Sequence, residues 1–254
     1  QFDYTGSYSG WGEISGRFNN CIGTQQIGPI AVLQGAYDGT SGMMRDDLRA
    51  ASLVPATEPY TGLGYTHVGG GGSETVAQSV LNTTGLDAIV DWVVVELRES
   101  ANPANVIASR SALMQADGDI VDVDGISTVA FDAVADGDYY VAILHRNHVG
   151  IMTGNALTLI SNAPTATTVD FTTTSLYGGP TAYATVGAGF QALVAGDASF
   201  DGQVQNTDDV YFWAPSTGSS GYQPGDYDLD AQVQNTDKVY YWISNAGLGT
   251  AIPQ

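Results

Sequence analysis

Cysteine is almost absent from this sequence, because Cys21 stands alone among 254 residues. A disulfide framework within the chain is therefore excluded. A bound calcium ion could cross-link the chain in place of the disulfides that stabilise many extracellular proteins. Cys21 itself is most simply interpreted as a small buried hydrophobic residue, with an intermolecular bridge as the second interpretation.

Basic residues are also scarce. The chain has 7 Lys and Arg against 27 Asp and Glu, which gives a net charge of −20. Such a surface repels nucleic acids and anionic membranes, and it attracts divalent cations instead. Only 13% of the residues are charged, well under the roughly 25% usual in soluble domains. Together with the abundance of Gly and Tyr, this composition is typical of an extracellular β-rich protein.

Long apolar runs are missing as well. The longest one, Ile89–Val95, is interrupted by Asp91, whereas roughly 20 apolar residues are needed to span a membrane. We therefore expect no membrane insertion. The sequence begins with Gln1 rather than Met, which we interpret as a mature protein whose signal peptide has been removed. The expected location is extracellular or at the cell surface.

Residues 86–160 carry the strongest β signal. The segment DAIVDWVVVELRES is rich in β-branched and aromatic residues. Further short apolar segments follow at intervals of roughly ten residues, separated by turn signals such as Asp-Gly and Asn-Pro. Residues 165–195 add the last strands. We expect a mainly β fold with a β-sandwich domain over residues 31–195, and we favour the sandwich over a closed barrel.

The N-terminal segment, residues 1–30, is extended and turn-rich. It is either the first strand of the main domain or an arm that completes the sheet of a neighbouring subunit. In the second case its aromatic side chains would bind the partner, namely Phe2, Tyr4, Tyr8 and Trp11. Further on, Ser41 can cap a short helix that ends before Pro55; the alternative is an irregular insertion with hydrophobic anchors.

An internal repeat occupies the C-terminal segment, residues 196–254. Residues 196–208 read GDASFDGQVQNTD and residues 225–237 read GDYDLDAQVQNTD, so the string QVQNTD recurs unchanged. An aromatic run follows each copy, VYFW and VYYW. A repeat with six identical consecutive residues is unlikely to arise by chance, and it indicates two copies of one structural unit.

The spacing within each copy is that of a twelve-residue calcium loop. Oxygen-bearing residues occupy positions 1, 3, 5 and 12, and position 7 offers a backbone carbonyl. In loop one these are Asp197, Ser199, Asp201, Gln203 and Asp208; in loop two they are Asp226, Asp228, Asp230, Gln232 and Asp237. Calcium is a hard cation that takes several such oxygens. We therefore predict Ca²⁺ as the cofactor, and we expect the aliphatic residue at position 8, Val204 or Val233, to hold each loop to its twin.

The loops depart from the sensor-type pattern in two ways. Position 12 is Asp instead of Glu, and position 6 of loop two is Ala231 where loop one has Gly202. The second departure strains the backbone and makes loop two the weaker candidate. After each loop the aromatic residues start a short helix or an extended segment. They either pack between the two halves or bind a partner; the candidates are Tyr211, Trp213, Tyr241 and Trp242.

Two parts of the sequence resemble known families. The segments GYTHVGGGGSET, DAIVDWVVVELRE, SRSALMQADGDIVDVDG and DGDYYVAILHRNHVGIMT resemble a module that recurs in large secreted and surface proteins of bacteria. The tail, with GDASFDGQVQNTD and GDYDLDAQVQNTDKVYYW, is similar to the dockerin-type calcium repeat. Together the matches cover most of residues 31–245. The first implies location more than activity, and the second implies calcium binding and docking to a cohesin-like partner.

Other constellations favour structural roles. The acidic group Asp117, Asp119, Asp122 and Asp124 suits turns and a solvated strand face better than a third cation site. The three histidines, His67, His145 and His148, suit hydrogen-bonded structural roles better than zinc binding. The Gly69–Gly72 run lacks the Lys-Ser/Thr pair of a nucleotide loop. We predict no enzymatic activity, and a glycan-cleaving enzyme is the last of the functions considered.

The sequence therefore predicts a secreted calcium-binding structural protein, a subunit of an extracellular fibre or surface assembly that associates with itself. The alternative is a dockerin-bearing module for adhesion or glycan binding that docks to a partner protein.

Overall fold

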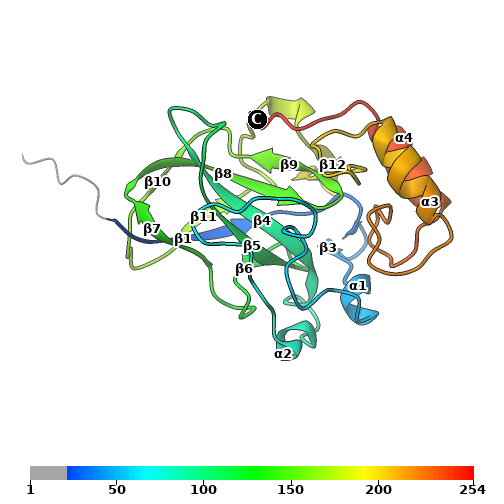
Figure 1. Ribbon diagram of the computed structural model, residues 1–254, viewed down its shortest axis with the longest axis horizontal. Coiled ribbons are helices and arrows are strands. Elements are labelled where there is room, and N and C mark those ends of the chain that lie inside the picture. The colour runs from blue at the N-terminus through cyan, green and yellow to red at the C-terminus, as the bar shows by residue number, and fades with distance from the viewer. Residues whose placement is uncertain (1–21) are drawn as a thin grey trace, which may run out of the picture.

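The computed structural model describes residues 22–254 and has a mainly β fold, as predicted (Figure 1). The predicted arm residues Phe2, Tyr4, Tyr8 and Trp11, and Cys21, lie outside the described residues. Among the described residues, no helix is both long enough and apolar enough to cross a membrane.

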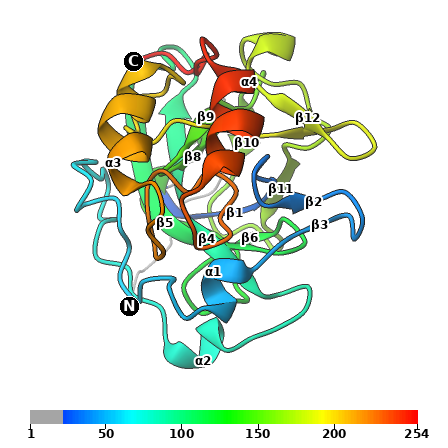
Figure 2. The ribbon, with the colours of Figure 1, turned by 90° about the vertical axis from the view of Figure 1, so that its right-hand side faces the viewer.

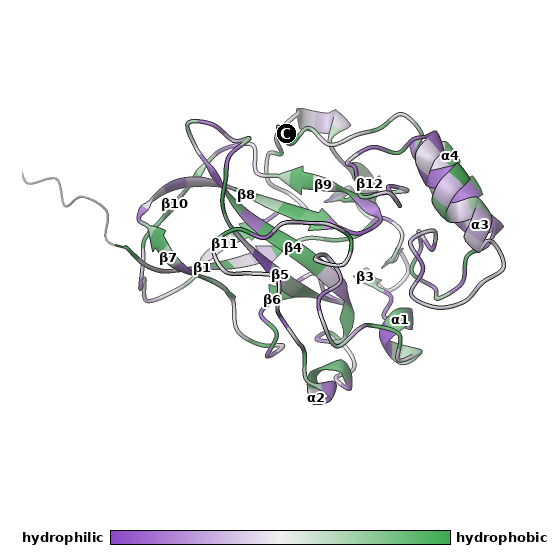
Figure 3. Cartoon of the chain, viewed as in Figure 1, coloured by the Kyte–Doolittle hydropathy of each residue, from purple (hydrophilic) through white to green (hydrophobic). Residues whose placement is uncertain are grey.

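A seven-stranded sheet forms one layer, in the order β14-β9-β8-β4-β5-β6, with β10 pairing β8. Its strands are β4 (Ile89–Glu99), β5 (Val106–Gln115), β6 (Ile120–Val121), β8 (Gly137–His145), β9 (His148–Met152), β10 (Leu157–Leu159) and β14 (Val194–Ala195). The central strand β4 is buried on both faces along nearly its whole length. An unbroken apolar run instead of an alternating one is the sequence pattern of such a strand, and the strands of this sheet carry most of the hydrophobic colour in Figure 3.

A three-stranded sheet forms the second layer, in the order β11-β1-β7. β1 (Ile22–Ile30) runs parallel to β11 (Thr167–Asp170) and antiparallel to β7 (Val129–Ala135). Residues 22–30 thus form a strand of the main domain within their own chain, and the arm interpretation of residues 1–21 stays a prediction. Ile27 and Phe131 contribute from this layer to the core shared with β4 and β5.

The segment between β1 and β4 covers the sandwich with short elements. They are β2 (Tyr37–Asp38), β3 (Met43–Met44), α1 (Asp47–Ala50) and α2 (Gln78–Leu81). The predicted helix before Pro55 is present, but it is only four residues long and begins after Asp46 instead of Ser41. The segment is anchored by hydrogen bonds from the Tyr60 hydroxyl to the carbonyl of Trp92 (2.7 Å) and from the Trp92 indole to the carbonyl of Pro55 (2.8 Å).

The two-loop unit, residues 196–254, packs against one end of the sandwich (Figure 1). η1 (Gly179–Thr181) and the β12–β13 hairpin (Ala184–Val186, Phe190–Ala192) precede it. Each loop leads into one continuous helix that contains a six-residue π-helical stretch, preceded by two α-helical residues. The first helix combines η2 (Asp208–Trp213) with α3 (Ala214–Ser216), and the second combines η3 (Asp237–Trp242) with α4 (Ile243–Asn245). The two helices lie side by side on the outer face of the unit (Figure 2).

Candidate calcium site

Loop one is organised by the carboxylates at its first and last positions. Asp197 and Asp208 are both buried. Asp197 accepts the backbone N–H groups of Asp201 (3.1 Å) and Gly202 (2.9 Å). Asp208 accepts the N–H of Ser199 (2.8 Å). The first two bonds fold positions 1 to 6 around the side chain of position 1, and the third joins position 3 to position 12.

Loop two has the same geometry. Asp226 accepts the N–H groups of Asp230 (3.1 Å) and Ala231 (3.0 Å). Asp237 accepts those of Tyr227 (2.7 Å) and Asp228 (3.2 Å). One carboxylate oxygen from each of Asp226, Asp228 and Asp237 lies within 4.8 Å of the other two. Three buried carboxylates that converge on one point repel one another. A hard divalent cation bound between them would neutralise this charge.

The fifth-position carboxylates are oriented alike in the two loops. Asp201 accepts the backbone N–H of Gln203 (3.0 Å) and the side-chain amide of Gln205 (2.6 Å). Asp230 accepts the equivalent bonds in loop two, at 2.9 and 2.7 Å. The repeated Gln at position 9 therefore explains part of the identity of the QVQNTD strings, because its amide holds the position 5 carboxylate in place.

The sixth position adopts a left-handed backbone in both copies, with φ of +85° at Gly202 and +73° at Ala231. The backbone of Ala231 is strained in the folded loop whether or not a cation is bound. This strain therefore lowers the stability of the fold more directly than it lowers calcium affinity. Loop two also offers a fourth carboxylate, Asp228, where loop one has only Ser199, and more ligand charge increases affinity. This argument ranks loop two above loop one, the reverse of the ranking that the sequence suggests.

Replacing Gly202 with Ala should destabilise the two-loop unit by about 1–2 kcal/mol, the usual cost of a left-handed non-glycine residue. Its Cβ would also lie 2.8 Å from Cγ2 of Thr250. Thermal unfolding should show a melting temperature lower by about 2–8 °C. The control is Gly202→Ala combined with Thr250→Ser, which removes the clashing methyl and should recover part of the loss. An unchanged melting temperature in Gly202→Ala would contradict the strain argument.

Burial raises the pKa values of several carboxyl groups in the two loops. Burial and the neighbouring Asp208 raise the pKa of Asp197 to about 7. Burial raises the pKa of Asp226 to about 8, with Arg146 opposing and Asp237 reinforcing the shift. Burial and Asp237 raise the pKa of Asp228 to about 6. These carboxyls therefore bind protons more readily than ordinary Asp side chains do, and a cation at the same oxygens would compete with those protons.

Calcium affinity should therefore rise as the pH increases from 5.5 to 7.5, by about tenfold per pH unit for each proton displaced. The raised pKa values stabilise the metal-free fold only at low pH, and this contribution is lost as the pH rises through 6 to 8. Calorimetric titrations in two buffers of different ionisation enthalpy would measure both affinity and proton release. Equal affinities at pH 5.5 and 7.5, without proton release, would contradict this prediction.

Each loop is joined to the opposite half of the unit through its position 8 residue. Val204 donates to the carbonyl of Leu248 (2.9 Å), in the segment that follows the second helix. Val233 donates to the carbonyl of Ser219 (2.9 Å), in the segment that follows the first helix. The backbone of position 8 thus bonds to the segment that follows the other loop's helix and not to the other loop itself, whereas the side chains of Val204 and Val233 share hydrophobic clusters with Trp242 and Trp213 of the opposite half. Each half of the unit consists of one loop and the helix that follows it. Each loop is closed by the segment that follows the helix of the other half.

One tryptophan from each helix forms a hydrogen bond with the loop of the other half. The Trp213 indole donates to the carbonyl of Gln234 in loop two (3.1 Å), and the Trp242 indole donates to that of Gln205 in loop one (3.0 Å). Trp213 is only 8% exposed, so it packs between the halves and is not available to a partner. Tyr241 and Trp242 are partly buried against the same cluster.

A different aromatic face is open to solvent. Tyr211 is 72% exposed and Tyr240, its counterpart in the repeat, is 66% exposed. Val210, Val239 and Ile243 are exposed beside them. Of the aromatic residues proposed as partner-binding in this unit, only Tyr211 is strongly exposed, whereas Tyr240 was not predicted.

The two-loop unit docks closely on the sandwich. Gly35 meets loop two where a Cβ would lie 1.8 Å from the carbonyl oxygen of Tyr227, so only glycine permits this approach. Arg45 donates to the carbonyl of Asp228 (2.7 Å), and the Tyr241 hydroxyl donates to that of Gly35 (3.4 Å). The loops are thus held in shape by the sandwich as well as by their own bonds.

A buried charge cluster lies under loop two, and sequence reasoning did not find it. Asp91 accepts Nε of Arg146 (2.8 Å) and the Tyr222 hydroxyl (2.5 Å). Arg146 also donates to the carbonyl of Gln223 (2.8 Å), three residues before loop two begins. The available signal was Asp91 itself, a lone acidic residue inside an apolar strand, since such a group is buried only with a partner.

The other constellations have ordinary structural roles in the described residues. Asp124 accepts the N–H groups of Ile126 and Ser127 and so shapes its own turn. His67 contacts Ser109 and Ser111, whereas His145 and His148 contact each other and the Asp91 cluster. The only group of three metal-type ligands within residues 22–254 is the one in loop two.

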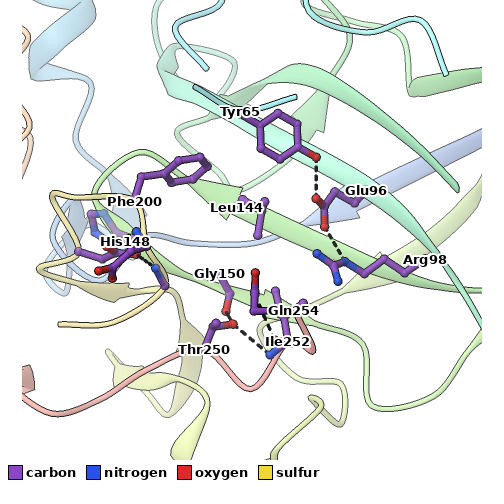
Figure 4. Close-up of a pocket in the computed structure, with 13 residues that line it drawn as sticks. Tyr65, Glu96, Arg98, Leu144, His148, Gly150, Phe200, Thr250, Ile252 and Gln254 are labelled. Atoms are coloured by element: carbon purple, nitrogen blue, oxygen red, sulfur yellow. Dashed lines mark hydrogen bonds and ion pairs between the residues drawn. The ribbon is translucent and has the colours of Figure 1, made fainter. Parts of the chain in front are cut away.

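A cavity of about 140 Å³ separates loop one from the large sheet (Figure 4). The Tyr65 hydroxyl donates to Glu96 (2.6 Å), and Glu96 accepts Nε of Arg98 (2.6 Å), so these polar groups satisfy one another. Asp197 and Asp201 reach the same cavity from the loop. It has room for a few water molecules and lies between the two-loop unit and the sandwich.

Comparisons with known proteins do not assign this chain to a family. No family model matches the sequence, and no curated protein matches it. A structural match exists with a crystal structure of a type II cohesin–X–dockerin complex from Acetivibrio cellulolyticus, with 12% sequence identity and a TM-score of 0.36, over 90% of this chain and 96% of that chain. This similarity is too distant to assign a family, and the dockerin-type resemblance of the tail stays a prediction.

Proposed function

We propose that this chain is a secreted, calcium-binding structural protein, a subunit that associates with itself into an extracellular fibre or surface assembly. The observation that carries the proposal is the matched pair of loops, whose buried first and last carboxylates are arranged alike and lie against the sandwich. Two ions at this position would join the C-terminal unit to the main domain. They would act as the cross-link in a chain with one cysteine. The proposal assigns the protein no catalytic activity.

The shape of the subunit supports an open-ended assembly. Ile22, where the described chain begins, is 69% exposed. The start of β1 lies at the end of the long axis opposite the helices α3 and α4 (Figure 1). The described chain therefore begins at one end of the molecule. An aromatic arm attached there that binds the next subunit makes a head-to-tail contact, and such contacts build filaments when they do not close into rings.

Electron microscopy of the full chain, with calcium and with a chelator, tests the assembly. Ordered filaments that fray on chelation are expected with calcium. A variant with Phe2, Tyr4, Tyr8 and Trp11 replaced by Ser should stay monomeric while it still binds calcium. If the wild type remains dispersed under both conditions, or if the variant polymerises like the wild type, the arm-mediated assembly is wrong.

The exposed helix face favours a second candidate function, a docking module for adhesion or glycan binding. Tyr211 and Tyr240 repeat with the period of the loops and stand out from the outer helices, and exposed aromatics of this kind form interface hot spots. A cohesin-like protein or a glycan would be the partner. Calcium-dependent retention of the wild type on an immobilised partner, lost in Tyr211→Ser with Tyr240→Ser, would support this function over self-assembly.

A further inference from the structure

The turn between β8 and β9 is the part of the sandwich that contacts both loops. Its four residues, His145–His148, are at most 4% exposed. The backbone carbonyl of Asn147 accepts the N–H of Asp197 (3.1 Å), the first position of loop one. Its side-chain amide donates to the carbonyl of Asp226 (2.6 Å), the first position of loop two. One buried residue thus holds the entry to both loops.

The orientation of this amide is fixed by its neighbour. The N–H of Gly35 donates to Nε2 of His148 (3.2 Å), so this nitrogen carries no proton. The proton of the neutral ring is therefore on Nδ1, which lies 2.8 Å from Oδ1 of Asn147 and donates to it. With its oxygen occupied in this way, the Asn147 amide presents its NH₂ group to loop two. The donor is therefore pre-oriented by the sandwich.

We propose that Asn147 is a positioning residue that couples the two calcium loops, so that binding at one loop strengthens binding at the other. This inference rests on the proposed calcium-binding function. An ion in loop one orders Asp197 and hence the backbone of Asn147, which carries the donor to loop two. A second link runs directly between the loops, because the Tyr227 hydroxyl of loop two donates to the carbonyl of Asp208 in loop one (3.3 Å). Ordering one loop therefore leaves less disorder to be removed from the other.

The two loops should respond differently to substitution of Asn147. Loop one is held by the backbone carbonyl, which Asn147→Ala keeps. Loop two is held by the side chain, and its loss leaves a buried carbonyl of Asp226 without a donor. With the other loop disabled, we expect calcium affinity at loop two to fall about tenfold and that at loop one to change less than about twofold. With both loops intact, the cooperativity between them should be lost.

The test is calcium titration of the full chain by calorimetry, with Asp208→Asn or Asp237→Asn added to isolate one loop at a time. Val141→Ala is the matched control, since Val141 is fully buried in β8 and its truncation lowers stability without touching the loops. A selective loss at loop two in Asn147→Ala, beyond that in Val141→Ala, supports the proposal. Equal losses in the two variants, or no loss, overturn it.

A second measurement does not depend on the folding of the Asn147 variant. If the loops are coupled, Asp208→Asn in loop one should weaken calcium binding at loop two, and Asp237→Asn should weaken loop one by the same factor. Two independent, unchanged affinities would overturn the coupling. Absence of any calcium binding in the wild type would instead refute the proposed function itself.

Discussion

Chelating calcium should lower the melting temperature of this protein by about 15 °C or more. At a calcium concentration about a thousand times the dissociation constant, each bound ion stabilises the fold by about 4 kcal/mol. Two such sites give about 8 kcal/mol, and for a chain of this size each kcal/mol corresponds to about 2–4 °C. The physical reason is the convergence of the buried carboxylates of Asp226, Asp228 and Asp237, which repel one another until a cation or protons neutralise them.

The effect should spread beyond the loops, because the sandwich and the two-loop unit share contacts. Arg98 of β4 donates to the carbonyl of Pro253 near the C-terminus (2.8 Å), and Arg45 donates to that of Asp228. Calorimetry with calcium and with chelator measures the shift, and hydrogen exchange locates it. Asp124→Asn, a change in an acidic turn outside the loops, is the control and should keep the full shift. A melting temperature that does not respond to chelation would contradict calcium binding.

The sequence was most informative where local pattern alone decides structure. The apolar run of β4 and its neighbours predicted the strands, and the repeated loop spacing predicted two loops whose hydrogen bonds agree in detail. β9 is hard to recognise in the sequence because only Arg146 and Asn147 separate it from β8. In the structure these residues are a tight turn between two strands, and the short segment up to Met152 pairs back on β8.

Contacts between distant segments could not be predicted. Gly35 is required by the carbonyl of Tyr227, which is 192 positions further along the chain, and nothing near Gly35 in the sequence indicates this. The parallel pairing of β1 with β11 is equally remote. The same holds for Trp213, whose burial depends on the partner half of the repeat. The spacing of the aromatic residues is compatible both with packing between the halves and with binding to a partner, because both need the same residue types.

Replacing Asp91 with Ala should destabilise the folded protein by about 3–5 kcal/mol, because it leaves the guanidinium of Arg146 buried without a counter-charge. Asp91 is fully buried, and besides Arg146 and Tyr222 it accepts the N–H of Trp92 (2.8 Å). Burial raises the pKa of Asp91, but Arg146 and the hydrogen bond from His145 outweigh it and hold that pKa well below its usual range. The carboxylate is therefore ionised at any pH at which the protein is studied. Urea unfolding in saturating calcium measures the loss, and a loss under about 1 kcal/mol would contradict a paired buried charge.

The double variant Asp91→Leu with Arg146→Met separates two roles of this pair. Replacing a whole buried ion pair by apolar residues often restores stability, since no charge remains to be solvated. Arg146, however, also holds the carbonyl of Gln223 and lies 3.9 Å above the ring of Tyr222, both just before loop two. If stability recovers in the double variant while calcium affinity at loop two stays low, the pair positions that loop. If affinity recovers together with stability, the pair contributes only to folding, and the shape of loop two is set by Asn147, Gly35 and its own hydrogen bonds.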